Sequence, residues 1–144
     1  MLRQTATAPN WSGATSSDVV PYNGATLAYV GDAVYELRVR EHLLARGLTK
    51  TDDLHRAAIR FTSAQGEAAA ADRLLSDILT EEETDVYKRG RNAPASHTPK
   101  NADPATYHRA SGLEALFGFL YLEGRRERLD ELLSAAIAAV EELL

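Results

Sequence analysis

The chain of 144 residues contains no cysteine, and methionine and tryptophan each occur only once. Without cysteine, disulfide frameworks, thiolate zinc sites and cysteine nucleophiles are excluded. No uncharged apolar run approaches the roughly 20 residues that a membrane-spanning helix needs. Residues 1–22 also lack an apolar stretch that would form the core of a signal peptide. We therefore expect a cytoplasmic protein without a membrane partner.

The net charge is −5 at pH 7, which on its face argues against nucleic acid as a partner. Segment 88–109 departs from this average, because it holds five basic residues and one acid, Asp103. The rest of the chain holds 11 basic and 20 acidic residues. A basic segment on an acidic body can bind phosphate groups if its side chains share one surface. It can equally be a solvated loop, and charge alone leaves both interpretations open.

Apolar residues recur at helical spacing from residue 23 onward, and no stretch alternates with period two over the length of a strand. Residues 1–22 lack any periodicity and are interpreted as a flexible arm, followed by one domain over 23–144. Capping residues and glycines divide this domain into helices. The predicted ranges are 24–46, 54–61, 64–79, 81–89, 104–123 and 126–144. The predicted fold class is all-α, with about six to seven helices.

Two acids stand alone in apolar surroundings. Asp32 and Glu36 are the only charged residues in 24–37, and Glu114 is the only one in 110–122. The first of these helices is apolar almost all round, so we expect it to be central and Asp32 to be partly desolvated. A carboxylate buried in such surroundings costs several kcal/mol unless a cation or hydrogen-bond donors compensate.

If the two helices cross, Asp32 and Glu114 can converge on one point, where a hard cation such as Mg²⁺ would relieve their repulsion. The alternative is that each acid pairs with an arginine or with backbone donors inside the bundle. Gly31 and Gly118 favour a close approach of the helices that contain them, because glycine within a helix costs about 1 kcal/mol relative to alanine.

These motifs resemble a known family. Residues 27–34 (LAYVGDAV) resemble the signature helix of the ribonuclease III endonuclease domain, and residues 113–118 (LEALFG) resemble its second acidic motif. Residues 88–93 (KRGRNA) and 98–101 (TPKN) are similar to the basic motifs of Mini-ribonuclease III, the branch that lacks a double-stranded-RNA-binding domain. The resemblance extends over about 23–142.

The resemblance implies an all-α homodimer that hydrolyses double-stranded RNA with Mg²⁺, for which Mn²⁺ can substitute, leaving 5′-phosphate and 3′-hydroxyl ends. It also implies maturation of the ends of 23S ribosomal RNA precursors. By matching position, Asp32 and Glu114 would be the catalytic and metal-binding acids. Two further acids of larger ribonuclease III enzymes are replaced here by Ala28 and Ser111, so we expect water molecules to complete the metal's coordination shell.

We expect Glu114 to bind the metal directly, and Asp32 to bind it or to orient a water molecule bound to it. Glu36 and Ser111 are candidates for polar groups just outside the metal ligands, although Glu36 is also placed to form an ion pair with Arg40. The basic segment is expected to reach across the minor groove of A-form RNA. Its candidate RNA-binding residues are Lys88, Arg89, Arg91, Asn92, His97, Thr98, Lys100, Asn101 and Arg109.

A second class of function remains open: a non-catalytic helical dimer that binds structured RNA or pre-ribosomal particles. A DNA-binding helix-turn-helix is disfavoured, because none of the predicted helices is strongly basic. Metal-dependent cleavage of duplex RNA distinguishes the enzyme from the scaffold.

Overall fold

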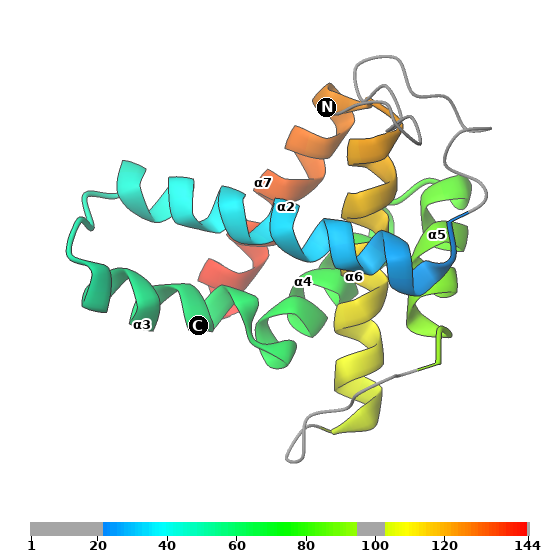
Figure 1. Cartoon of the computed structure of the whole chain (residues 1–144), viewed down its shortest axis with the longest axis horizontal. Helices are drawn as coiled ribbons and strands as arrows, with labels where there is room; N and C mark the ends of the chain where they lie inside the picture. Colours follow the sequence, from blue (N-terminus) through cyan, green and yellow to red (C-terminus); the bar gives the residue numbers. More distant parts are fainter. Residues whose placement is uncertain (1–21, 95–102, 144) are drawn as a thin grey trace, which may run out of the picture.

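The computed structural model describes residues 22–94 and 103–143, and six α-helices make up nearly all of these two ranges (Figure 1). No strand occurs in them, so the all-α prediction is confirmed. None of the six helices is long and apolar enough to cross a membrane. The helices are α2 (Gly24–Ala45), α3 (Thr51–Thr62), α4 (Ala64–Asp77), α5 (Glu81–Arg91), α6 (Pro104–Leu122) and α7 (Arg126–Leu143).

Side-chain caps fix where the helices begin. The Asn23 carboxamide accepts a hydrogen bond from the Thr26 amide at 2.9 Å, and Ser63 caps α4 in the same way. Thr80 and Glu83 form a reciprocal capping box at the start of α5. All three caps stand where the sequence predicts them.

Three helix boundaries differ from the prediction by two residues or more, one of them the end of α5, which reaches Arg91 rather than residue 89. Helix α3 begins at Thr51, three residues earlier than predicted, because Asp52 and Asp53 in its first turn favour a helix N-terminus. Helix α4 ends at Asp77, two residues earlier than predicted.

Helices α2 and α6 cross in contact, backbone against backbone, at the centre of the fold (Figure 1). A Cβ atom on Gly31 would lie 1.6 Å from the Glu114 carbonyl oxygen, and one on Gly118 would lie 2.0 Å from the Leu27 carbonyl oxygen. Only glycine fits at either position, which confirms the predicted close approach. The crossing brings Asp32, next to Gly31, beside Glu114.

The core surrounds this crossing. Tyr35 of α2 stacks on Phe117 of α6 with ring centroids 5.5 Å apart, and its hydroxyl donates a hydrogen bond to the Phe61 carbonyl at 3.2 Å. That bond ties the end of α3, and therefore the start of α4, to the central pair. The fully buried residues that complete this core include Leu27, Val39, Leu74, Leu113, Leu116, Leu120, Leu132 and Leu133.

Candidate functional site

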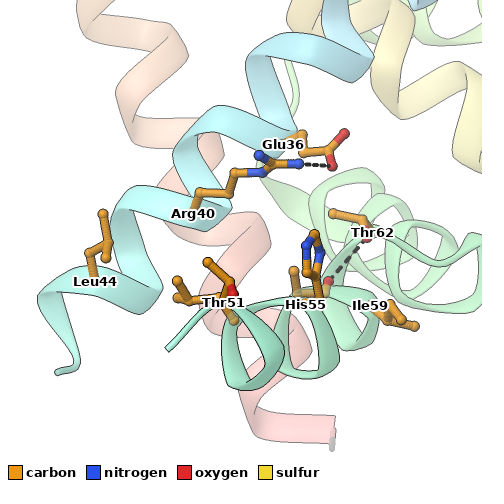
Figure 2. Close-up of a pocket in the computed structure, with 9 residues that line it drawn as sticks. Glu36, Arg40, Leu44, Thr51, His55, Ile59 and Thr62 are labelled. Carbon is orange, nitrogen blue, oxygen red and sulfur yellow. Dashed lines mark hydrogen bonds and ion pairs between the residues drawn. The ribbon is translucent and has the colours of Figure 1, made fainter. Parts of the chain in front are cut away.

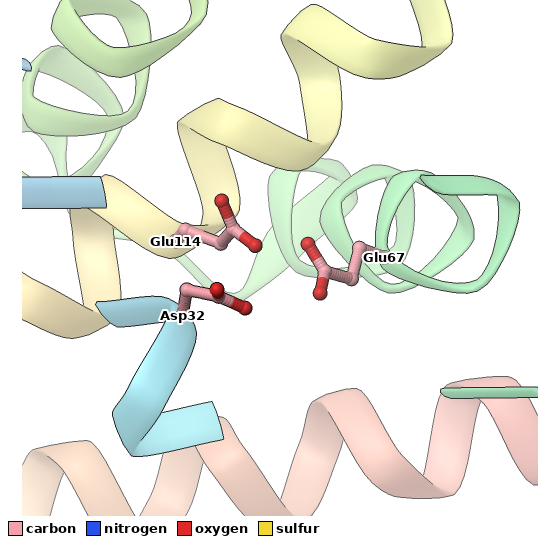
Figure 3. Close-up of side chains that lie close together, drawn as sticks. All are labelled: Asp32, Glu67 and Glu114. Carbon is pink, nitrogen blue, oxygen red and sulfur yellow. The ribbon is translucent and has the colours of Figure 1, made fainter. Parts of the chain in front are cut away.

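Three carboxylates from three different helices converge beside the α2–α6 crossing (Figure 3). Asp32 comes from α2, Glu67 from α4 and Glu114 from α6. One carboxylate oxygen from each residue lies within 4.8 Å of the other two. The predicted convergence of Asp32 and Glu114 is therefore present, and it includes a third acid that sequence reasoning missed.

The three acids differ in exposure. Glu67 is buried, with 2% of its surface exposed, and Glu114 is half-buried. Asp32 is exposed, contrary to the expectation that it would be partly desolvated. Helix α2 is covered on the face that contains Leu27, Gly31 and Tyr35, but its Asp32 side is open. The cluster is thus closed toward the core and open to solvent at Asp32.

Burial and mutual repulsion hold protons on this cluster. Burial raises the pKa of Glu67 well above its usual value, and the neighbouring charges of Glu114 and Asp32 raise it further. Burial also raises the pKa of Glu114, to about 8, with a further rise from Asp32 and an opposing hydrogen bond with Glu67. The three carboxyl groups therefore do not all ionise at neutral pH without a positive partner.

No such partner comes from the described residues, because no arginine, lysine or histidine contributes to the shifts of Glu67 or Glu114. The alternative for Asp32 and Glu114 was pairing with an arginine or with backbone donors, and no such ion pair or hydrogen bond reaches Glu114 within the described ranges. The N-terminus of α4 favours an acid such as Glu67 by only about 0.3–1 kcal/mol. Burying an uncompensated carboxylate costs several kcal/mol. The helix terminus is too weak to balance that cost.

A divalent cation fits the arrangement chemically. Hard cations bind carboxylate oxygens at about 2.0–2.6 Å. The three oxygens lie within 4.8 Å of one another, so small side-chain rotations would bring all three within reach of one ion. All of the donor atoms here are oxygens, and the open side at Asp32 leaves room for water or substrate. The residues that can hold the ion are Asp32, Glu67 and Glu114.

Comparison with known proteins identifies the family of this site. The ribonuclease III domain family matches residues 25–125. Mini-ribonuclease 3 of Symbiobacterium thermophilum is 53% identical over 116 residues, which cover 81% of this chain and 88% of that protein. Mini-ribonuclease 3 of Enterococcus faecalis is 46% identical over 126 residues, 87% of this chain and 96% of that protein. The chain belongs to the Mini-ribonuclease III branch of the ribonuclease III family.

Membership in Mini-ribonuclease III makes the chain an endoribonuclease of double-stranded RNA. A crystal structure of a protein from Fusobacterium nucleatum superposes with a TM-score of 0.73 at 27% identity, covering 84% of this chain and 96% of that one. The helical fold is therefore shared with an experimentally determined structure.

Glu67 carries a sequence signal that could have identified it in this Mini-ribonuclease III chain. It is the only charged residue in 61–71 (FTSAQGEAAAA), the same isolation that marks Glu114. It also lies in the first turn of α4, where acids commonly favour a helix N-terminus. Because an acid at this helix position has an ordinary explanation, sequence reasoning did not single out Glu67 as a site residue.

Glu36 forms the ion pair that was the alternative to a role near the metal. Its carboxylate accepts a hydrogen bond from Arg40 at 2.9 Å, at the edge of a cavity of about 270 Å³ between α2 and α3 (Figure 2). Ser111 is half-buried and lines a second cavity, of about 210 Å³, together with Ala28 and Glu114. Ser111 therefore lies next to one acid of the cluster.

The basic residues of α5 lie near the start of α2. Lys88 and Arg89 are exposed, and an Arg89 guanidinium nitrogen donates a hydrogen bond to the Tyr22 carbonyl. Arg91 donates to the Asn92 side chain at 3.0 Å. A Cβ atom on Gly24 would lie 2.3 Å from the Arg89 carbonyl oxygen, so the end of α5 contacts the first turn of α2.

Arg109 of α6 is less available than predicted, because its Nε atom lies 3.3 Å from a carboxylate oxygen of Asp72. The other candidate RNA-binding residues, His97, Thr98, Lys100 and Asn101, lie outside the described residues.

Proposed function

We propose that this chain hydrolyses phosphodiester bonds of double-stranded RNA with Mg²⁺, leaving 5′-phosphate and 3′-hydroxyl ends, and that Mn²⁺ can substitute for Mg²⁺. The observation that carries this proposal is the convergence of Asp32 and Glu114 at the α2–α6 crossing, where no cation from residues 22–94 or 103–143 neutralises Glu114. Asp32 and Glu114 are the proposed catalytic and metal-binding residues.

The two acids have different tasks in this proposal. Glu114 is held in place because its own backbone packs against Gly31, so its carboxylate is a fixed metal ligand. Asp32 is exposed at the open side, where it can bind the metal or orient an attacking water toward the RNA backbone. A divalent cation at this point supplies an activated water and neutralises charge on the phosphoryl group.

The basic end of α5 is proposed to bind the RNA backbone. Gly24, which contacts Arg89, precedes Asp32 by eight residues of α2. At 1.5 Å per residue this places the basic end about 12 Å along the helix axis from the acids. That distance is short enough for one duplex to contact both. The residues proposed to bind RNA are Lys88, Arg89, Arg91, Asn92 and Arg109, with His97, Thr98, Lys100 and Asn101 of the adjoining segment. Glu36 and Ser111 remain proposed as polar groups just outside the metal ligands.

We further propose a homodimer that is formed through the exposed apolar face of α2. Tyr29 and Leu37 on this face are 83% and 61% exposed, and Ala33 lies between them at the spacing of one helical turn. These residues and Tyr121 border a hollow of about 510 Å³ that also contacts Asp32. A symmetric pair of copies would bury this face and place both acid clusters on one duplex.

The dimer is tested by light scattering at micromolar concentration. Leu37→Glu should convert a dimer into a monomer, whereas Leu44→Glu, at another exposed leucine of α2, should leave the dimer intact. A wild-type chain that is monomeric under the same conditions contradicts this part of the proposal.

The natural substrate is proposed to be the precursor of 23S ribosomal RNA, as the resemblance to Mini-ribonuclease III implies. Mapping the 5′ ends produced from that precursor by the wild type and by Asp32→Asn tests this. Discrete ends at the mature termini that depend on Asp32 support the proposal, and cuts elsewhere contradict it.

Cleavage of a short RNA duplex tests the central activity. Wild-type protein should cut the duplex only with Mg²⁺ or Mn²⁺, and Asp32→Asn and Glu114→Gln should each lose about 100-fold or more of the rate, because each removes charge from the metal site. Glu127→Gln, at an exposed acid of α7, is the matched control. If the wild type binds the duplex without cutting it, the non-catalytic RNA-binding dimer is the correct function.

A further inference from the structure

Glu67 has no part in the function proposed from Asp32 and Glu114, yet its environment is the most unusual of any acid in the described residues. It is 2% exposed, and the charged groups that act on its carboxyl within the described ranges are other acids, Glu114, Asp32 and Glu36, with the Tyr35 hydroxyl also nearby. No cation and no hydrogen-bond donor from outside the cluster reaches it among these residues. A buried carboxyl in such surroundings is either kept neutral by a proton or balanced by a cation in the space that it faces.

The direction in which Glu67 points is set by the backbone. Ser63 caps α4 by accepting a hydrogen bond from the Gly66 amide at 3.1 Å. A Cβ atom on Gly66 would lie 2.2 Å from the Arg60 carbonyl oxygen, so the first turn of α4 is pressed against the end of α3. Buried alanines follow at positions 68, 70 and 71. Helix α4 therefore cannot turn Glu67 toward solvent, and Figure 3 shows its carboxylate directed at Asp32 and Glu114.

We propose that Glu67 is a third metal ligand, supplied by α4 and located opposite the open side of the cluster. This inference rests on the proposed metal-dependent function and adds a ligand to it. The site then has one buried ligand, one half-buried ligand and one exposed ligand, each on a different helix. All three carboxylates would hold the cation, and the outermost of them, Asp32, lies at the exposed side where RNA would approach.

A purely structural role makes a different prediction. If Glu67 only shares a proton with Glu114, a glutamine at position 67 keeps a hydrogen-bonding partner for Glu114 and changes nothing in metal binding. If Glu67 is a ligand, the same substitution removes one charged oxygen donor and weakens binding of the metal.

The test measures binding of Mn²⁺ alone to the full-length protein without RNA, from the electron paramagnetic resonance signal of free Mn²⁺. Glu67→Gln should weaken Mn²⁺ binding about tenfold or more, Glu114→Gln should weaken it at least as much, and Glu127→Gln should leave it unchanged. Raising the metal concentration should restore much of the RNA cleavage by Glu67→Gln but not that by Glu114→Gln. Wild-type affinity in Glu67→Gln, with weak binding in Glu114→Gln, overturns the proposal.

Two controls keep the outcome decisive. If Glu67→Gln does not fold, Glu67→Asp, which keeps the charge but retracts the oxygens by one methylene, should bind Mn²⁺ more weakly than the wild type, and unchanged affinity overturns the proposal. Failure of the proposed function gives a different result: the wild type binds Mn²⁺ in a manner that depends on Glu67 but does not cut RNA.

Discussion

Glu67 and Glu83 are the two buried charged residues in the described part of the chain, and each is 2% exposed. Each also lies in the first turn of its helix, α4 or α5. Their surroundings are opposite. Glu83 accepts two hydrogen bonds from Arg128, each of 2.8 Å, and one from the Thr80 amide at 2.9 Å. In the same part of the chain, the charged groups that act on Glu67 are all acids.

Glu83 is thus an acid that stabilises the fold, whereas Glu67 is an acid that we propose binds a metal ion. Burial alone raises the pKa of Glu83, but the hydrogen bonds from Arg128 and Thr80 outweigh it and the pKa is lowered. At Glu67 the effect of burial is unopposed by any cation and the pKa is raised. Two acids with equally little exposed surface, each in the first turn of its helix, thus have pKa shifts of opposite sign, and their partners account for the difference.

The largest effect on stability is expected when the hydrogen-bonded ion pair of Glu83 and Arg128 is broken. Glu83→Ala should lower the free energy of unfolding by about 3 kcal/mol, because it leaves Arg128 without its partner and removes the α5 capping box. Urea denaturation measures this. Glu67→Gln, measured without metal, should not destabilise the protein. If Glu67→Gln lowered the free energy of unfolding as much as Glu83→Ala does, Glu67 would also be an acid that stabilises the fold, and the difference between the two sites would be contradicted.

The pH dependence of stability should have opposite signs at the two sites. Glu114 has a raised pKa, so its stabilising contribution in the metal-free protein is complete below its usual value of 4.5 and is lost as pH rises through about 8. Glu67 acts in the same direction. Glu83 has a lowered pKa, so its contribution is present above 4.5 and is lost as pH falls through its folded value.

Thermal melts of metal-free protein between pH 3 and pH 9 test these signs. Glu67→Gln should reduce the alkaline loss of stability, which we expect to be on the order of 1–3 kcal/mol, and Glu83→Gln should reduce only the acid loss. If the stability of the metal-free wild type does not change from pH 5 to pH 9, then Glu67 and Glu114 do not lack a positive partner, and this prediction is contradicted.

The smallest effect is expected at an exposed pair, which supplies the baseline for the comparison. Arg73 and Asp77 form an ion pair at 3.0 Å on the surface of α4. Asp77→Asn should change the free energy of unfolding by less than about 0.5 kcal/mol, because solvent screens exposed charges. If urea denaturation shows a change in the free energy of unfolding above 1 kcal/mol, this exposed ion pair cannot serve as the baseline.

Local signals in the sequence were sufficient for most of the fold. Asn23, Ser63 and Thr80 each satisfy free amides of a helix N-terminus in a way that depends only on adjacent residues, so the helix starts could be predicted. Gly31 and Gly118 likewise mark the crossing, because glycine is unfavourable within a helix unless another backbone comes close.

The site was predicted less completely, because it depends on contacts between distant residues. Asp32 and Glu114 stand out as isolated acids in apolar helices, whereas Glu67 resembles an ordinary first-turn acid until α4 is packed on α6. The exposure of Asp32 was wrongly predicted for a related reason: helical periodicity does not show which apolar side of α2 other helices cover. The pairing of Arg109 with Asp72 also arises only in the folded chain.

The central claim is that carboxylates from α2, α4 and α6 bind one divalent cation. Anomalous diffraction from crystals of this protein soaked in Mn²⁺ tests it most directly. The account predicts a manganese peak within about 2.0–2.4 Å of one oxygen each of Asp32, Glu67 and Glu114. A fully occupied manganese ion bound elsewhere, or bound here with Glu67 turned away from it, would contradict the account.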